Sequence, residues 1–390
     1  MPTVQELLTA LRQHTEEAPS AEQLRAVAQA VSELDTMLIA WFPATRHWFI
    51  TVEQNEPTAV VFSNRDSFEA FAARCKEQGI YVEAMENAKA DRPALFMDLV
   101  RCGFTQVLID YAPAFLVLPV TAFVKLPDFT ELSLVERPFP APFLTGKILY
   151  LFQQIHAKKA DGELELAVLR ELYHSPLFMP VQVFEADGQT AYHVPAEEQD
   201  GKRTAHLFTD RVEWERFGVS PEYAPAIARF AELQTLLQGG FDRLVINPGS
   251  GAELVLDASL LDAAEQAVMG DVRELDLRSL QTQGEKLTVS DPVETPDKLI
   301  AALISVLEQQ DMVNAAYLRV LKRSNVLHPS WLVLLDLRED RGRKTLHREL
   351  STAAQPYLGS FDIEFAAYDE AEDFAGKTKP FYKKRRGLFR

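Results

Sequence analysis

Short apolar runs alternate with amphipathic segments along most of the chain. Apolar runs bounded by polar or turn-forming residues, such as 58–62, 105–109 and 243–246, predict β-strands. Aromatic side chains three positions apart, such as Phe68 and Phe71, predict helices that turn one face to a core. Many connections between the predicted strands are too short for a crossover helix, so the pattern predicts an α+β fold with mixed or antiparallel sheets.

A strand that leads into a helix occurs twice. Thr-Ala-Val-Val-Phe-Ser-Asn-Arg at residues 58–65 is matched by Thr-Ala-His-Leu-Phe-Thr-Asp-Arg at residues 204–211. Downstream, Gly-Phe-Thr-Gln-Val-Leu-Ile-Asp at 103–110 is matched by Gly-Phe-Asp-Arg-Leu-Val-Ile-Asn at 240–247. In the first pair a polar residue can cap the helix, and in the second a glycine suited to the left-handed conformation ends a helix before a strand. Two matched segments in the same order indicate an internal duplication.

The matches place the two copies near residues 22–130 and 163–272. Each copy is predicted to run helix, three strands, helix, helix, two strands, helix. Between them, the proline-rich segment Glu-Arg-Pro-Phe-Pro-Ala-Pro at 136–142 interrupts regular structure, and a helix over 147–160 follows. A third region has helices over 297–309 and 344–354 and strands over 316–321, 331–337 and 361–368.

This pattern predicts three folded parts, which agrees with a length of 390 residues at about 100 to 200 residues per domain. The predicted parts are a first module (1–135), a linker with a connecting helix (136–162), a second module (163–280), a smaller α+β domain (290–378) and a basic tail (379–390).

Charge and cysteine content narrow the classes of function. A formal net charge of -17 repels nucleic acid and anionic lipid and favours basic partners. Two cysteines without Cys-x-x-Cys spacing provide neither a disulfide framework nor a zinc motif. The first thirty residues lack a signal-peptide pattern, and the apolar stretch 105–124 is interrupted by Asp110, Pro113 and Pro119. We therefore expect a cytoplasmic protein with a protein partner, no metal, no cofactor and no transmembrane segment.

A glycine turn in the second copy is the best-shaped candidate for a binding loop. In Asn-Pro-Gly-Ser-Gly at 247–251, successive backbone N–H groups could form a nest for an anion, with Gly249, Ser250, Gly251 and Arg211 as candidate ligand-binding residues. The alternative is a hairpin turn before a returning strand, which the missing Walker lysine favours. Ser250 also lacks the strand-to-helix context of a nucleophile elbow.

Arg65 and Arg211 recur at the start of a helix in both copies, where the helix dipole disfavours a positive charge. A carboxylate partner within the chain would explain the repetition. Recognition of an acidic ligand is the alternative.

Histidine and cysteine residues offer weaker candidates. His193 and His206 lie near acidic residues at 197, 198 and 200, but His206 matches Val60 of the first copy, which favours a structural role over a metal site. Cys102 could be a reactive thiol if exposed, whereas buried thiols are the expected state of both Cys75 and Cys102.

The last residues combine basic and aromatic side chains. Lys379, Phe381, Tyr382 and Lys383 are candidate partner-binding residues, and this tail is the one segment through which nucleic acid binding is conceivable. The alternative is an ordered or frayed terminus that the acidic surface of the same protein neutralises.

These motifs together resemble the SseB family, named for enhanced serine sensitivity. The resemblance rests on the polar helix start before Arg211, on Leu-Val-Ile-Asn-Pro-Gly-Ser-Gly at 244–251 and on Lys-Pro-Phe-Tyr-Lys at 379–383. The first copy resembles a divergent duplicate of the family's N-terminal domain, because its turn at 110–113 lacks the glycines. The resemblance implies a fold and no catalytic residues, since the family has no established enzymatic mechanism.

We therefore expect a non-catalytic interaction or accessory protein. The alternative is a module that responds to a small anion, nucleotide or amino acid, or an uncharacterised enzyme, that uses the turn at Gly249–Gly251.

Overall fold

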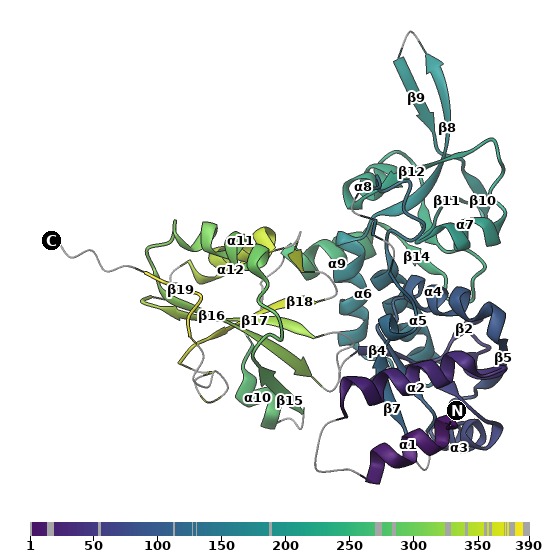
Figure 1. The fold of residues 1–390 in the computed structure, drawn as a ribbon. Helices are drawn as coiled ribbons and strands as arrows, with labels where there is room; N and C mark the ends of the chain where they lie inside the picture. The colour runs from purple at the N-terminus through teal and green to yellow at the C-terminus, as the bar shows by residue number, and fades with distance from the viewer. Residues whose placement is uncertain are drawn as a thin grey trace. The chain divides into compact units, whose positions relative to one another are not determined.

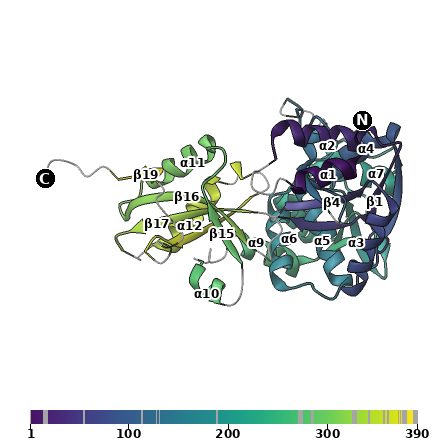
Figure 2. The same cartoon turned by 60° about the horizontal axis from the view of Figure 1, so that its bottom comes forward.

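The computed structural model shows a chain of mixed sheets flanked by helices (Figures 1 and 2). It describes residues 2–13, 19–53, 56–111, 114–126, 128–129, 131–186, 189–269, 275–282, 286–323, 329–339, 342–354, 357–358, 361–369, 371, 373 and 379–384. The chain divides into two compact units, Met1–Ala264 and Glu265–Arg390. Parallel and antiparallel strand pairs occur in both units, which confirms the predicted α+β class.

The first module is built on a seven-stranded sheet with the order β2-β1-β4-β6-β7, in which β3 pairs with β4 and β5 pairs with β1. Its elements are α1 (Val4–Gln13), α2 (Ala21–Glu33), β1 (Thr36–Phe42), β2 (His47–Trp48), β3 (Ile50–Glu53), β4 (Glu56–Phe62), α3 (Arg65–Glu77), β5 (Glu83–Ala88), η1 (Lys89–Asp91), α4 (Arg92–Arg101), β6 (Gln106–Ile109), β7 (Leu116–Pro119) and η2 (Val120–Ala122). β4 and β6 run parallel and the other pairs are antiparallel.

Aromatic packing holds α3 on this sheet. Phe62 at the end of β4 meets Phe68 and Phe71 of α3, with ring centroids 5.4 Å apart in both pairs. These rings and Cys75 belong to one buried cluster, so the predicted i, i+3 face is the core face. The helix begins where Asn64 accepts a hydrogen bond from the Ser67 N–H, as its polar start predicts.

The connecting helix is part of the core of the N-terminal unit. α5 (Pro142–His156) begins at Pro142 instead of the predicted residue 147, because proline is well suited to the first turn of a helix. Gln153 of α5 accepts from the Ile50 N–H at 3.0 Å and donates to the Ile50 carbonyl at 2.7 Å. Its amide thus hydrogen-bonds the backbone of β3.

The second module divides its strands between two sheets, β10-β11-β13-β14 and β12-β8-β9. A bridge between Phe178 and Phe208 joins them. The elements are α6 (Gly162–His174), β8 (Leu177–Ala186), β9 (Gln189–His193), β10 (Glu197–Gln199), β11 (Lys202–Leu207), α7 (Arg211–Phe217), β12 (Ala224–Ala228), α8 (Phe230–Gln238), β13 (Arg243–Ile246), β14 (Leu254–Leu256) and α9 (Ala258–Met269).

Strand register repeats between the two modules. Thr58 pairs with Gln106 in parallel β4 and β6, and Thr204 pairs with Arg243 in parallel β11 and β13. These are the positions that the two sequence matches make equivalent. Gly103 and Gly240 both have positive φ, +80° and +97°, as the predicted helix ends require. The predicted order was wrong at three points. Four strands instead of three precede the first central helix of each module, and a strand lies between the two central helices, β5 in the first module and β12 in the second. The last helix predicted for the first module is the short 3-10 helix η2.

The C-terminal unit carries a five-stranded sheet with the order β15-β16-β17-β18, and β19 pairs with β16. Its elements are α10 (Leu277–Thr282), β15 (Leu287–Ser290), α11 (Asp297–Leu307), β16 (Val313–Arg323), β17 (Ser330–Leu337), α12 (Arg343–Ala354), β18 (Asp362–Ala367) and β19 (Tyr382–Lys383). Leucine residues of α11 and α12 form its main core with Phe365 of β18. The predicted helices and strands of this region are all present.

Among the described residues, no helix is both long enough and apolar enough to cross a membrane.

Candidate functional site

Each module contains the same polar turn where its two parallel strands end. The strand-ending residues Asp110 and Asn247 occupy the left-handed region, with φ of 59° and 52°. The Asp110 carboxylate accepts from the Ser63 N–H at 2.8 Å, and the Asn247 amide oxygen accepts from the Thr209 N–H at 3.0 Å. Aspartate and asparagine tolerate this conformation better than other side chains do. Their side chains therefore tie the end of one parallel strand, β6 or β13, to the start of the helix that follows its neighbour, α3 or α7.

The residue that caps the helix beside this turn is a carboxylate in the second module and an amide in the first. Asp210 caps α7 and accepts from the N–H groups of Val212 and Glu213, whereas Asn64 caps α3. Glu213 occupies the position that Ser67 holds in the first module. Asp210 is fully buried and Glu213 is nearly so. Two buried carboxylates need positive partners, because an uncompensated buried charge is strongly unfavourable.

Arg101 of the first module supplies the main positive partner. Its Nη1 lies 3.0 Å from Asp210 Oδ2 and 3.3 Å from Glu213 Oε1, and its Nε lies 2.7 Å from Asp98 Oδ1. Asp98 also accepts from the Trp48 indole N–H at 2.6 Å. We call this group, completed by His47 and Arg216, the interface cluster. It joins α4 and β2 of the first module to α7 of the second.

His47 and Arg216 complete the interface cluster beside Glu213. Arg216 donates to both oxygens of Glu213, at 2.9 and 3.1 Å, and lies 3.3 Å from His47 Nε2. Burial lowers the pKa of His47 to about 3, and the charges of Arg216 and Arg101 add to the shift. The ring is therefore neutral at pH 7, and Nε2 acts as the acceptor. Burial also raises the pKa of Glu213, against the lowering influence of Arg216 and Arg101.

The glycine turn of the second module packs against the first module. A Cβ atom on Gly251, which has φ of +83°, would lie 3.0 Å from the Thr45 carbonyl oxygen and 3.1 Å from that of Ala44. Ser250 is buried, and its hydroxyl accepts from the Ala252 N–H. The Gly249 N–H donates to Glu253 Oε2 at 2.9 Å. This turn therefore links β13 to β14, and a carboxylate of the same loop accepts its first glycine N–H.

Arg211 points to the linker and not to the glycine turn. It donates through Nη2 to the Val135 carbonyl at 2.9 Å, and its guanidinium lies 4.8 Å from the centre of the Phe178 ring. Arg65 instead forms an exposed ion pair with Glu86. The expected carboxylate partner is thus found for Arg65, whereas Arg211 uses a backbone carbonyl and an aromatic ring. The two arginines share a position and differ in their contacts.

The equivalent turn of the first module is covered by the N-terminal helix. Gln5 of α1 donates to Asp110 Oδ2 at 3.0 Å, and the Tyr111 N–H donates to the Ser67 hydroxyl at 3.0 Å. The neighbour of this turn is therefore a neutral amide, which binds the residue at the strand end, whereas Arg101 binds the helix start in the second module.

The candidate histidines and cysteines do not form a reactive or metal-binding group among the described residues. His206 lies 3.5 Å from Glu197 on the neighbouring strand, and burial lowers its pKa. His193 is exposed on β9. Burial raises the pKa of Cys75 to about 11 and raises that of Cys102 well above its usual value, so both thiols stay protonated at pH 7. Within the described residues, no group of three potential ligands could hold a metal ion.

The C-terminal candidates split between core and surface. Phe381 and Tyr382 pack against the main core of the C-terminal unit, and the Tyr382 hydroxyl donates to the Leu307 carbonyl at 3.1 Å. Lys379 and Lys383 are exposed. Lys384 forms an ion pair with Asp311, which is the neutralisation within the chain that the acidic surface predicts. The rest of the predicted tail, 385–390, lies outside the described residues.

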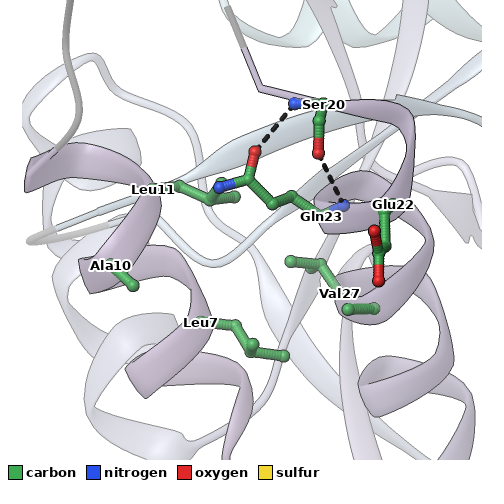
Figure 3. Close-up of a pocket in the computed structure, with 8 residues that line it drawn as sticks. Leu7, Ala10, Leu11, Ser20, Glu22, Gln23 and Val27 are labelled. Carbon is green, nitrogen blue, oxygen red and sulfur yellow. Dashed lines mark hydrogen bonds between the residues drawn. The ribbon is translucent and has the colours of Figure 1, made fainter. Parts of the chain in front are cut away.

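One groove is visible in the N-terminal unit between α1 and α2 (Figure 3). It has a volume of about 340 Å³ and is mostly apolar. Ser20 and Gln23 line one end and are held by a capping box, with hydrogen bonds of 2.8 and 3.3 Å. The other lining residues are Leu7, Ala10, Leu11, Glu22, Ala26 and Val27.

Sequence reasoning missed the interface cluster. Asp110 and Asn247 were visible as equivalent ends of the duplicated strand, and their shared tolerance of positive φ was the available signal. Asp210 and Glu213 could have been noted as acidic replacements of Asn64 and Ser67. Nothing in the local sequence of Arg101 indicates that its partners lie more than a hundred residues away.

Comparison with known protein families matches the second module and the C-terminal unit. Residues 152–263 match the SseB protein N-terminal domain, and residues 281–384 match the SseB protein C-terminal domain. No curated protein and no solved structure matches the chain. The first module lies outside both matched ranges. The two matches together cover more than half of the 390 residues, and the chain belongs to the SseB family.

Proposed function

We propose that this protein is a non-catalytic interaction protein, in which the first module is a structural support for an SseB-type second module. The observation that carries the proposal is Arg101, which binds the acidic start of α7 from another module. Helix starts beside the ends of parallel strands are common ligand sites in α/β proteins. Here that position serves contact between modules.

The state of the reactive side chains supports the same role. A nucleophile or general base needs access to substrate and a pKa matched to its task. Ser250 is buried in a turn, Cys75 and Cys102 are buried with raised pKa values, and His47 is buried with a pKa near 3. These features favour packing over chemistry.

The anion-binding alternative receives less support from the geometry. It needs the glycine turn to converge with Arg211 or Arg243 on one pocket. Arg211 faces the Val135 carbonyl, and Arg243 donates through Nε to the Thr204 hydroxyl at 2.9 Å. Glu253 already accepts the Gly249 N–H, so an added anion would meet a negative charge.

The test is recovery of a partner and then removal of the reactive groups. The tagged full chain is purified from native lysate, and any stoichiometric partner is identified by mass spectrometry and purified. Its Kd is then measured with wild type and with the Ser250→Ala and His206→Gln variants. We expect the Kd values of wild type and both variants to agree within about twofold, because neither side chain has a catalytic role in the proposal. Twofold corresponds to about 0.4 kcal/mol. Turnover of a metabolite by the purified chain, with no stoichiometric partner in lysate, would contradict the proposal.

A further inference from the structure

The β8–β9 ribbon of the second module is longer than its counterpart in the first. Leu38 pairs with Phe62 as Phe178 pairs with Phe208, which makes Phe42 equivalent to Gln182. Phe42 pairs with His47 and Gln182 pairs with His193, so four residues separate the first pair and ten separate the second. The additional residues of the second module lengthen β8 and β9. Figure 1 shows the longer ribbon projecting beyond the rest of its module.

Apolar side chains are exposed on both faces of this ribbon. Val183 is 50% exposed and its direct cross-strand neighbour Tyr192 is 64% exposed, so the two share one face. Phe184, the next residue along β8, is 47% exposed and lies on the opposite face. A two-stranded ribbon without further cover is only marginally stable in water. Additional sheet or side-chain contact would therefore stabilise it.

Other edge strands of the N-terminal unit carry features that prevent pairing with another chain. Charged residues and proline on an edge strand block such pairing. β5 carries Glu83 and Glu86, β10 carries Glu197 and Glu198, β7 contains Pro119 and β12 contains Pro225. The edge strands β2 and β14 are only two and three residues long, and short edge strands offer little backbone to a partner. The backbone of β3 at Ile50 is hydrogen-bonded by Gln153.

β9 has none of these features. Its sequence, Gln-Thr-Ala-Tyr-His at 189–193, contains no proline and no aspartate, glutamate, lysine or arginine, although the chain carries 57 acidic residues. Among the described residues β9 pairs with β8 alone, at one edge. An uncharged strand can face an identical strand without like-charge repulsion across the pair. A basic partner has no negative side chain to recognise on β9 itself.

We propose that β9 pairs antiparallel with β9 of a second copy of this chain, so that two β12-β8-β9 sheets become one continuous sheet. The contact is isologous, because the same strand serves on both sides, and it closes as a dimer. It satisfies the outer backbone groups of β9 and covers Tyr192 and its neighbours.

The size and charge of this contact predict its strength and salt dependence. A five-residue strand pair with a few apolar side chains is smaller than the roughly 800 Å² per partner of a standard interface, so we expect a Kd in the micromolar range. Two chains of net charge -17 repel each other at long range, and salt screens that repulsion. The dimer is therefore expected to tighten with added salt, whereas a complex with a basic peptide would weaken.

The test is the mass of the full chain by sedimentation equilibrium from about 1 to 100 µM, a span that brackets the expected Kd. Wild type is expected to shift from 43.9 kDa toward twice that mass. Tyr192→Glu places like charges in the contact and is expected to weaken dimerisation at least tenfold. Tyr81→Glu is the matched control, because Tyr81 is 67% exposed next to a different edge strand, and it should leave the dimer unchanged. Circular dichroism checks that both variants fold.

Concentration-dependent hydrogen exchange provides a second readout. Amides of residues 189–193 are expected to exchange more slowly in dimer than in monomer, and Tyr192→Glu should remove that difference. A wild type that stays at 43.9 kDa throughout, or a dimer equally sensitive to both variants, would overturn the proposal. Either outcome leaves the interaction role untouched, because that role is tested by partner recovery. A monomer that binds a lysine-rich extended peptide through β9 would overturn self-pairing in favour of a basic partner.

Discussion

The two modules share a backbone device and differ in what surrounds it. In both, a residue with positive φ, Asp110 or Asn247, ties a strand end to the start of a helix. The first module surrounds this device with Asn64, Ser67 and the amide of Gln5, whereas the second surrounds it with two carboxylates and Arg101. The local geometry is the same in the two modules, whereas the charge around it differs and forms an interface in the second.

The same comparison explains why the second module could not make the Arg101 contact with a further module. The first module presents Arg101, Asp98 and Trp48 to the second, and the equivalent positions of the second module are Gln238, Thr235 and Val194. A head-to-tail contact between repeated units grows into an open array unless one end lacks the complementary surface. The second module lacks the charges, so this mode of contact ends after two modules.

The largest expected effect comes from giving the first module the residue of the second. Arg101→Gln leaves Asp210 and Glu213 buried without their shared cation, which should lower the free energy of unfolding of the N-terminal unit by about 3–5 kcal/mol. Urea unfolding followed by tryptophan fluorescence measures the change. Gln238→Ala, at the exposed equivalent position, should change it by less than about 0.5 kcal/mol. Similar losses in both variants would contradict the assigned role of Arg101.

Glycine substitutions separate backbone strain from close packing. On Gly103 a Cβ would lie 2.5 Å from the Pro142 carbonyl oxygen, whereas on Gly240 the nearest atom is the flexible Arg203 side chain at 3.6 Å. Both positions have positive φ. We expect Gly103→Ala to cost about 3 kcal/mol and Gly240→Ala about 1 kcal/mol in thermal or urea unfolding. Equal costs would show that α4 and α5 can separate without penalty.

Reciprocal exchange of the two positive-φ residues tests their electrostatic surroundings. Asp110→Asn keeps an oxygen that accepts the Ser63 N–H. The new NH2 group replaces the oxygen that accepts from Gln5, but the Gln5 amide can turn its own oxygen toward it, so the substitution should cost less than about 1 kcal/mol. Asn247→Asp adds a buried negative charge near Asp210, since Thr209 contacts both side chains, and should cost about 2–3 kcal/mol. The asymmetry, measured by urea unfolding at pH 7, is the informative quantity. The extra cost of Asn247→Asp should disappear when Asp210 is also changed to Asn.

The smallest expected effect is a pH dependence that belongs to one histidine. His47 has an unfolded pKa of 6.5 and a folded pKa of about 3, so the unfolded chain binds more protons between these values. The stability contributed by neutral His47 is complete above pH 6.5 and is lost as the pH falls toward 3. From pH 6.5 to 5 the loss is about 1.6 kcal/mol. The raised pKa of Glu213 acts in the opposite direction, because the folded state then holds its proton more tightly.

Two histidine variants isolate this contribution. His47→Gln should remove that part of the acid destabilisation, because glutamine accepts the Arg216 N–H without titrating. His193→Gln is the matched control, since His193 holds the equivalent position on the exposed ribbon. Unfolding measured at half-unit steps from pH 7 to 5 separates them. Parallel pH profiles for wild type and His47→Gln would exclude His47 as the source.

The predicted fold succeeded where local pattern decides structure. The strands β4, β6, β11 and β13 and the caps at Asn64 and Asp210 follow from apolar runs and polar helix starts. The prediction missed β5, which reads Glu-Ala-Met-Glu-Asn-Ala, and β12, which contains a proline. Edge strands tolerate charge and proline, so their composition resembles a loop and their pairing with β1 or β8 decides their structure.

By itself, the sequence determined the repeated strand-and-helix segments and the polar turn of each module. These depend on residues next to one another: a cap, a glycine with positive φ and an aspartate or asparagine that tolerates the same conformation. Only the tertiary structure decided that Arg101 meets Asp210 and Glu213, that Gly251 packs on Ala44 and Thr45, and that β9 pairs with β8 alone among the residues described. The physical reason is that a buried charge takes its partner from whatever folding brings beside it, and sequence spacing carries no record of that neighbour.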